Sequence, residues 1–323
     1  MRKIGVHLIT GFLGSGKTTF LNHLIAAWQP RRLFVIENEV GKIGIDGALV
    51  VGGAEEVVEL SSGCLCCSLH GDLREVLEIA FTKRDDYDRL VIETTGVADP
   101  ASIVQLFLAD PGVEKYFHLE NTICLADAAL LEDWLRDTDE ARRQLVVADA
   151  VLLNKADSVR PAYLEKVREL LRGINPFASV WTGEQGRFPV DAVLATESFR
   201  RAGVEAREGE LHGRNVHLAH DITTFTLTYT EPFDLRTLAP ELYRMVLLYR
   251  HQIYRIKAIL DVIDNPTRVI VQSVRSSVLL TDGSPWEAGV RTSKIVCIGR
   301  DLRREAIERI FKRHLRPNLT PTP

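Results

Sequence analysis

Residues 11–19 read Gly11-Phe12-Leu13-Gly14-Ser15-Gly16-Lys17-Thr18-Thr19, between an apolar run at 4–10 and a helix-like segment at 20–28. The pattern G-x-x-x-x-G-K-[ST] between a strand and a helix is a P-loop, whose backbone N–H groups and helix N-terminus hold phosphate oxygens. We expect Lys17 to reach the β- and γ-phosphates and the Thr18 hydroxyl to ligate Mg²⁺. The nucleotide-binding residues predicted here are Gly11, Gly14, Ser15, Gly16, Lys17, Thr18 and Thr19.

A second motif follows the predicted buried strand at 89–92, where the chain reads Glu93-Thr-Thr-Gly96. Many P-loop proteins place a carboxylate here for Mg²⁺ and a glycine whose N–H contacts the γ-phosphate. Glu93 is therefore predicted to act in catalysis together with Lys17 and Thr18, and Gly96 to bind nucleotide. The plain alternative is a strand that merely ends in a turn.

A third motif, Asn154-Lys155-Ala156-Asp157, follows the predicted strand at 150–153. In GTPases this pattern at the end of a strand recognises guanine, because the aspartate accepts hydrogen bonds from N1–H and the exocyclic amino group. Adenine lacks that pair of donors, so the wrong base leaves a charge unpaired. Asn154, Lys155 and Asp157 are therefore predicted to bind the nucleotide, which favours GTP over ATP.

Buried strands alternate with helical segments through the first part of the chain, which is typical of an α/β domain with a mainly parallel sheet. Ligands bind at the carboxyl ends of such strands, where all three motifs fall, so we expect one site. A chain of 323 residues is long enough for two domains. We predict a P-loop NTPase domain at 1–195, a linker at 196–220 and a smaller α+β domain at 221–316.

The helices of the two predicted domains follow from capping and stop signals. A helix is expected at 161–172, with Gly173 as its stop. Asp234 is expected to cap a helix whose core face includes Tyr249, and Asp301 to cap a final helix that reaches residue 314. The second domain's strands are expected at 224–229, 253–262, 267–274 and 293–298.

Charge and hydropathy argue against two classes of partner. The net charge of −4 gives no electrostatic reason to expect binding to nucleic acid or an anionic membrane. No apolar stretch approaches the roughly 20 residues that span a bilayer. Met1, Arg2 and Lys3 run straight into the first strand, unlike a cleaved signal. We expect a protein of the reducing cytoplasm.

Five cysteines occur, three of them in Cys64-Leu65-Cys66-Cys67. In a reducing compartment such a cluster indicates metal or redox chemistry before disulfides. Neighbouring thiolates repel one another unless a cation lies among them, and sulfur ligands favour Zn²⁺ or Cu(I). A tetrahedral Zn²⁺ needs a fourth ligand, which water, an incoming protein group or Glu37 could supply. A transferable metal is favoured, while a redox-active dithiol and inert structural cysteines remain open.

The remaining cysteines and the histidines of the linker carry weaker signals. Cys124 and Cys297 lie inside apolar strands and are expected to be ordinary core residues. Three histidines of the predicted linker could hold a metal, but solvated loop residues are the favoured interpretation. They are His212, His217 and His220.

With these motifs the chain closely resembles the CobW-like GTPases, relatives of the nickel-insertion GTPases of urease and hydrogenase maturation. The resemblance rests on residues 11–19, 37–41, 64–67, 93–96 and 154–157. It extends into the second domain through Arg255-Ile-Lys257, Gln272-Ser-Val274, Trp286 and Ile298-Gly-Arg300. The resemblance implies GTP/GDP and Mg²⁺ as cofactors, hydrolysis coupled to metal handling, and Cys64, Cys66 and Cys67 as metal ligands.

The resemblance leads us to expect a Mg²⁺-dependent GTPase that acts as a Zn²⁺ metallochaperone for a client metalloprotein. Co²⁺ delivery to cobalamin synthesis is the alternative within the family. A metal sensor without transfer and a P-loop ATPase or kinase are alternatives from other classes. Lys42 stands where the family commonly has an acidic residue, and Ala258 where it commonly has glycine. Oligomeric state, including a homodimer, stays open.

Overall fold

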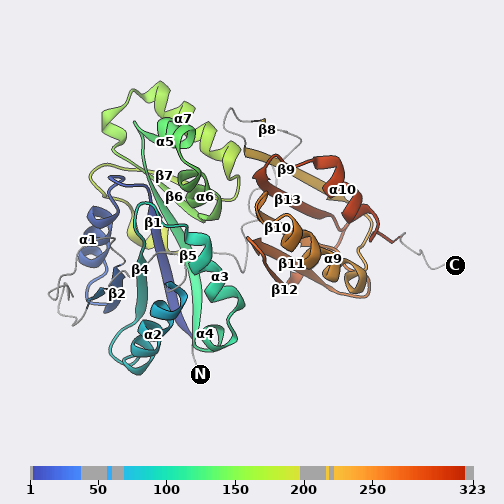
Figure 1. Ribbon diagram of the computed structural model, residues 1–323, viewed down its shortest axis with the longest axis horizontal. Coiled ribbons are helices and arrows are strands. Elements are labelled where there is room, and N and C mark those ends of the chain that lie inside the picture. Colours follow the sequence, from blue (N-terminus) through green and yellow to red (C-terminus); the bar gives the residue numbers. More distant parts are fainter. Residues whose placement is uncertain (1–2, 38–56, 60–68, 197–215, 218–221, 317–323) are drawn as a thin grey trace. The chain divides into compact units, whose positions relative to one another are not determined.

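The computed structural model describes residues 3–37, 57–59, 69–196, 216–217 and 222–316. The chain divides into two compact units (Figure 1), which are Met1–Arg172 with Ala178–Phe199, and Gly173–Phe177 with Arg200–Pro323. Within the described ranges, no helix is both long enough and apolar enough to cross a membrane.

The first unit is built on a parallel sheet. Neighbouring strands of this sheet pair in parallel throughout the described residues. Successive side chains of a strand point to opposite faces, and every residue of the strand Ala150–Asn154 is buried, so both faces of the sheet are covered there. In spatial order the strands are β3 (Val57–Glu59), β2 (Leu33–Glu37), β4 (Arg89–Glu93), β1 (Ile4–Gly11), β5 (Phe117–Asp127), β6 (Ala150–Asn154) and β7 (Ser179–Thr182).

Helices of the first unit connect these strands (Figure 1). The helix after β1 buries Phe20, Leu21 and Leu24 in a core that also contains Ile9 and Ile123 of the sheet. This packing fixes the start of that helix at the carboxyl end of β1. The elements are α1 (Lys17–Ala27), α2 (Leu69–Thr82), α3 (Pro100–Ala109), α4 (Pro111–Tyr116), α5 (Leu131–Asp137), α6 (Asp139–Val147), the 3₁₀ turn η1 (Ala156–Ser158), α7 (Pro161–Ile174) and α8 (Val190–Leu194).

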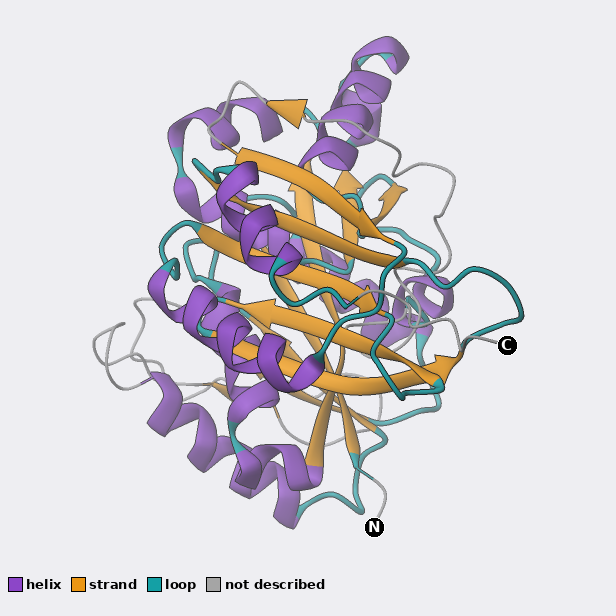
Figure 2. Cartoon of the chain, turned by 90° about the vertical axis from the view of Figure 1, so that its right-hand side faces the viewer, coloured by secondary structure: helices purple, strands orange, loops and turns teal. Residues whose placement is uncertain are grey.

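The second unit is an antiparallel sheet with helices over one face (Figure 2). Alternate residues of its strands, such as Phe225 and Ile256, pack against helix residues Leu242 and Phe311 in one core. In spatial order the strands are β12 (Ser277–Pro285), β11 (Thr267–Val274), β10 (Ile253–Leu260), β13 (Ser293–Arg300), β9 (Ile222–Tyr229) and β8 (Val216–His217), and the helices are α9 (Leu235–Leu248) and α10 (Arg304–Lys312).

The predicted fold class is confirmed, and three local predictions are wrong. Helix α7 continues through Gly173 and ends at Ile174. Tyr249 is 40% exposed because it is the C-cap of α9, beyond the last turn that faces the core. Asp301 does not cap α10: it lies in a turn with φ of 51°, and the helix begins after Arg303, whose side chain makes no capping hydrogen bond.

Several elements lie where no element is predicted. Helices α3 and α4 occupy the stretch after Gly96, and β12 precedes the last strand of the second unit. The predicted linker at 196–220 contains β8, which pairs Val216 with Thr224 of β9. A two-residue strand offers too short an apolar pattern to detect in the sequence.

Candidate functional site

The P-loop connects β1 to α1 and is shaped by glycines with positive φ. Gly11, Gly14 and Gly16 have φ values of 141°, 75° and 97°. A Cβ on Gly16 would collide with Nδ2 of Asn154, so only glycine fits at this position. Gly16 is also the N-cap of α1, and no side chain caps this helix end within the described residues. The first N–H groups of α1 and the unpartnered buried hydroxyl of Ser15 thus form a cradle suited to an anion.

Lys17 lies in the first turn of α1, with its amine folded back into the P-loop. Its side chain is largely buried, and Nζ donates to the carbonyl oxygens of Gly11 (3.0 Å) and Phe12 (3.3 Å). Burial lowers the pKa of Lys17, and the nearby Glu93 carboxylate opposes that shift. Burial also raises the pKa of the adjacent Cys124 to about 12, so this core thiol stays neutral. The two carbonyl acceptors hold the ammonium in place. Because they carry no net charge, they do not neutralise it.

The structure brings Thr18 and Glu93 together, although they are 75 residues apart. Thr18 Oγ1 donates to Glu93 Oε1 at 3.3 Å. Parallel pairing of β1 with β4 places Glu93 beside Ile9, at the carboxyl end of the sheet. Hydroxyl and carboxylate oxygens are hard ligands of the kind Mg²⁺ prefers. The Thr18 hydroxyl and the Glu93 carboxylate therefore fit Mg²⁺. Thr19, the next residue of α1 after Thr18, is exposed.

The segment after Glu93 lies directly against the P-loop. A Cβ on Gly96 would stand 2.6 Å from the backbone nitrogen of Leu13, which explains why glycine is needed for this close approach. The segment is held from the other side by Gln144 of α6, which is 1% exposed. Its Nε2 donates to the carbonyl oxygens of Gly96 (3.0 Å) and Ala98 (3.2 Å). Gln144 is a site residue that sequence analysis missed, because nothing in its local pattern distinguishes it.

Asn154 bridges the P-loop and the loop after β7. Its Nδ2 donates to the carbonyl oxygen of Ser15 at 3.0 Å, and its Oδ1 accepts from the N–H of Gly186 at 3.0 Å. The side chain is 2% exposed, so both amide ends are satisfied away from water. Asn154 thereby ties the predicted guanine-binding motif to the phosphate-binding motif.

Lys155 is anchored by a buried carboxylate. Its Nζ lies 2.7 Å from Oδ2 of Asp127 and donates to the carbonyl oxygen of Gly14 at 2.9 Å. Asp127 is 2% exposed, and its other oxygen accepts from the N–H of Ala129. The role of Asp127 was missed from the sequence, although a carboxylate at the end of a parallel strand is a signal that could have found it.

Asp157 has a different environment from the residues around it. It lies in η1 and is exposed, and its carboxylate makes no hydrogen bond within the described part of the chain. Asn154 and Lys155 are thus used to hold loops together, while the Asp157 carboxylate faces solvent and can accept hydrogen bonds from a ligand.

Comparison with known proteins identifies the family of this chain. The family described as "CobW/HypB/UreG, nucleotide-binding domain" matches residues 5–182, which is more than half of the chain. The chain belongs to the CobW family. The description "Cobalamin synthesis protein cobW C-terminal domain" matches residues 222–315, so both parts of a CobW-family protein are present.

Two CobW-family relatives align along nearly the whole chain. The protein named zinc chaperone YjiA from Escherichia coli K12 is 31% identical over 316 residues, covering 96% of this chain and 98% of YjiA. The protein named zinc chaperone CobW from Pseudomonas aeruginosa is 31% identical over 349 residues, covering 95% and 90%. The crystal structure of Zn(II)-bound YjiA GTPase superposes with a TM-score of 0.77 at 27% identity, covering 98% of this chain and all of that one.

The predicted metal site of this CobW-family chain lies mainly outside the described residues. Glu37 is the last residue of β2, where its backbone pairs with Glu93 of β4. His217 belongs to β8. Among the described side chains, no group of three or more His, Cys, Asp and Glu could hold a metal ion. The predicted ligands Cys64, Cys66 and Cys67 lie outside the described ranges, as do the linker histidines His212 and His220.

Proposed function

We propose that this protein is a Mg²⁺-dependent GTPase of the cytoplasm that carries Zn²⁺ and transfers it to a client metalloprotein. The observation that carries the proposal is the gathering of Lys17, the Thr18–Glu93 pair and the Asn154–Asp157 motif at one edge of the parallel sheet. The choice of metal is supported by the zinc-chaperone names of relatives that align over nearly the full chain.

Each residue of the phosphate end has a distinct part in the proposed hydrolysis. Lys17 would bind the β- and γ-phosphates from inside the P-loop, and Thr18 and Glu93 would hold Mg²⁺. The bound ion supplies charge neutralisation at the phosphates, which together with positioning is most of phosphoryl-transfer catalysis. Gly96 would offer its N–H to the γ-phosphate, on a segment whose carbonyl groups Gln144 fixes.

Guanine selectivity in this proposal rests on Asp157. Its exposed carboxylate would accept from guanine N1–H and the exocyclic amino group. Adenine would leave the carboxylate without donors, at a cost of about 1–3 kcal/mol. A direct test is competition of GTP against ATP for the intact protein, and equal affinities for the two nucleotides would overturn the GTPase assignment.

Metal carriage in this proposal rests on Cys64, Cys66 and Cys67, with Glu37 as a further ligand. Glu37 ends β2 in register with Glu93 on the neighbouring strand, so the proposed Mg²⁺ and Zn²⁺ residues leave adjacent strands at the same level. A change at the γ-phosphate therefore needs no long relay to alter the zinc ligands. Coupling of this kind is reciprocal and typically amounts to about 5- to 150-fold in affinity.

The test is a chelator competition that measures Zn²⁺ affinity with a non-hydrolysable GTP analogue, with GDP and without nucleotide. We expect affinities that differ between the three states and a lost site in the Cys66→Ser, Cys67→Ser double variant. The matched control is Cys297→Ser, a buried cysteine of the second unit, which should keep the wild-type stoichiometry. Identical affinities in all three states would rule out coupling, and the same competition with Co²⁺ tests the alternative metal.

A further inference from the structure

Helix α9 of the second unit carries large apolar side chains on two faces, whereas a helix that packs against one core usually has a polar outer face. Its inner face enters the core through Leu238, Leu242 and Val246. On the outer face Tyr243 is 48% exposed and Leu247 is 53% exposed. Residues four apart on a helix are neighbours, so these two side chains form one exposed apolar surface.

This surface continues along the helix as a stripe. Pro240, which is also exposed, precedes Tyr243 by three residues and Leu247 by seven. Leu248 is 70% exposed and widens the surface at the end of α9. We call Pro240, Tyr243, Leu247 and Leu248 the outer stripe. Apolar residues at positions i, i+3 and i+7 are the pattern through which helices pack on a partner.

A cation lies at each end of the outer stripe. Arg236 precedes Pro240 by about one turn, and Arg250 follows the C-cap residue of α9. Both side chains are exposed, and neither makes an ion pair or a side-chain hydrogen bond with another residue of the described ranges. At a rise of about 1.5 Å per residue, the two arginines are roughly 20 Å apart along the helix. Both guanidinium groups are therefore accessible to a partner.

The carboxylates of this helix are paired with other residues. Glu241 lies 2.8 Å from Arg244, and Asp234, which caps α9, lies 3.1 Å from Arg316. Across residues 222–316, Lys and Arg outnumber Asp and Glu, although the whole chain has a net charge of −4. This part of the chain is therefore positively charged, and its charge complements an acidic partner.

The same charges disfavour a second copy of this chain as the partner. Tyr243 lies midway between Arg236 and Arg250 in the sequence. In an antiparallel pair of α9 helices centred on Tyr243, Arg236 of each copy would lie opposite Arg250 of the other. In a parallel pair each arginine would meet its own counterpart. Like charges that face each other are destabilising, whereas carboxylates at those places would attract the arginines.

We propose that the outer stripe docks an amphipathic helix of a partner protein, with an apolar face and carboxylates at both ends. The apolar face packs on Tyr243 and Leu247, which removes their exposed surface from water. The carboxylates pair with Arg236 and Arg250, and this pairing sets the position of the partner helix along α9. The proposal rests on α9 alone and does not depend on GTP hydrolysis or on metal transfer.

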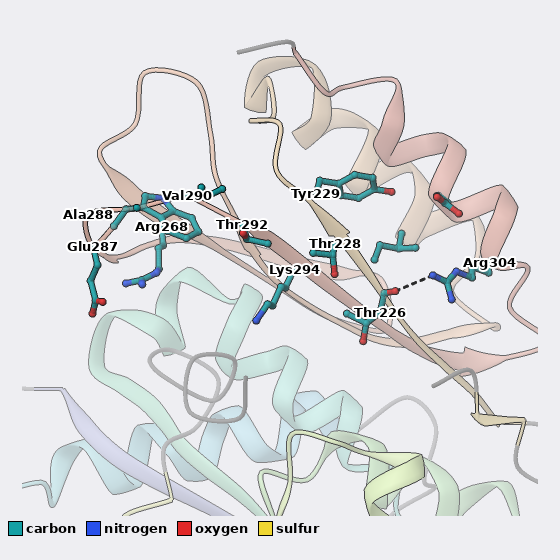
Figure 3. Close-up of a pocket in the computed structure, with 14 residues that line it drawn as sticks. Thr226, Thr228, Tyr229, Arg268, Glu287, Ala288, Val290, Thr292, Lys294 and Arg304 are labelled. Atoms are coloured by element: carbon teal, nitrogen blue, oxygen red, sulfur yellow. Dashed lines mark hydrogen bonds between the residues drawn. The ribbon is translucent and has the colours of Figure 1, made fainter. Parts of the chain in front are cut away.

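Another exposed apolar side chain of the same unit offers a matched control. Val290 is 83% exposed and lines a cavity of about 700 Å³ beside β9 and β13 (Figure 3). No residue of α9 is among the described residues that line this cavity. Val290→Ser thus removes exposed apolar surface from the second unit without altering the outer stripe.

The test is fluorescence anisotropy of the full-length protein with a labelled helical peptide of Ala and Gln that has Leu along one face and Glu in its first and last turns. We expect this Glu peptide to bind at low salt, and a peptide with Lys in place of Glu to bind about tenfold more weakly, with a smaller difference at high salt. Leu247→Ser should weaken binding of the Glu peptide about tenfold, and Val290→Ser should leave it unchanged. The double variant Arg236→Glu, Arg250→Glu should prefer the Lys peptide.

Two further arms address the other occupants of such a surface. Sedimentation velocity of the unaltered protein and of Leu247→Ser tests a second copy, and flotation with phosphatidylserine vesicles tests a lipid surface. A dimer or vesicle binding that Leu247→Ser abolishes would overturn the proposal. It would also be overturned if the Glu peptide failed to bind, if Leu247→Ser and Val290→Ser bound it alike, or if the charge-reversed double variant kept its preference for Glu.

Discussion

Replacing Gln144 with leucine tests whether the segment after Glu93 must be held in place for nucleotide hydrolysis. Leucine has a similar size and cannot donate, so the substitution leaves the carbonyl oxygens of Gly96 and Ala98 without the Nε2 donor at 3.0 and 3.2 Å. Gln144 is 1% exposed, and water is therefore poorly placed to replace it. Each buried acceptor left unsatisfied costs about 1–3 kcal/mol, so the two together should cost roughly 2–6 kcal/mol of folding free energy.

A matched control separates this local effect from general destabilisation. Asn121 is likewise a buried amide side chain, and its Nδ2 donates to the backbone carbonyls of Val193, Leu194 and Thr196. It lies four residues before Leu125, the β5 residue that pairs with Gly11 at the P-loop. Asn121→Leu should thus lower stability by at least as much, since three carbonyls and the buried His7 Nδ1, 2.8 Å from Asn121 Oδ1, lose their partner, without touching the nucleotide site.

The assay measures urea unfolding, GTP and GDP affinity, and kcat for both variants. For Gln144→Leu we expect GTP affinity and kcat each to fall about tenfold while GDP affinity is kept, because only GTP carries the γ-phosphate that Gly96 is proposed to contact. A tenfold change corresponds to about 1.4 kcal/mol, which is less than the free energy that the two lost hydrogen bonds cost. Gln144→Glu, which keeps the shape but places a carboxylate against the two carbonyl oxygens, should lower GTP affinity and kcat at least as much. If Gln144→Leu and Asn121→Leu have the same nucleotide profile, the positioning argument is wrong.

Three further expectations follow from the same geometry. Lys17→Ala should abolish GTP hydrolysis measured by phosphate release. The control Lys166→Ala, which removes an exposed lysine paired with Glu132, should retain hydrolysis. Hydrolysis by Lys17→Ala would show that the site is not at the P-loop. Asp157→Ala should reduce the preference for GTP over ATP by about tenfold or more in competition binding, since donors of the base lose their acceptor. Burial lowers the pKa of His7 from 6.5 to about 4, so the unfolded state takes up the proton first as pH falls. Stability should therefore decrease as pH decreases through that window, by at most about 1.4 kcal/mol per pH unit. His7→Gln should flatten this dependence in urea unfolding, and an unchanged slope would contradict the assignment.

The predictable part of the site consists of residues whose chemistry is written in short local motifs. The glycines and the lysine of the P-loop and the aspartate after a later strand are such residues. When they occur in this order along a chain, few functions other than nucleotide binding account for them. The contacts that join the motifs are different in kind, since Asn154 meets Ser15 across 139 residues. Such a bond forms only when β1 and β6 occupy the right places in the sheet. Local sequence patterns predict the strands themselves but not the order in which they pair.

The unpredicted helices show a related limit. Asp99-Pro100 and Asp110-Pro111 begin α3 and α4, with each aspartate accepting from the following turn, so capping signals for both helices were present in the sequence. For α6 the cap at Thr138 is equally local. These signals predict where a helix starts but not which neighbour it packs against.

The position of α6 explains why its contribution escapes a local analysis. Its Gln144 and Arg143 meet the segment after Glu93, with Arg143 lying 3.4 Å from Asp99 at the start of α3. Only Ala148 and Asp149 separate the end of α6 from β6, which leads to Asn154. One short stretch of chain thus contacts the proposed γ-phosphate segment at one end and carries the guanine motif at the other. We therefore expect a substitution in α6 to alter both the phosphate end and the guanine end of the nucleotide site, although no residue of α6 belongs to a nucleotide-binding motif.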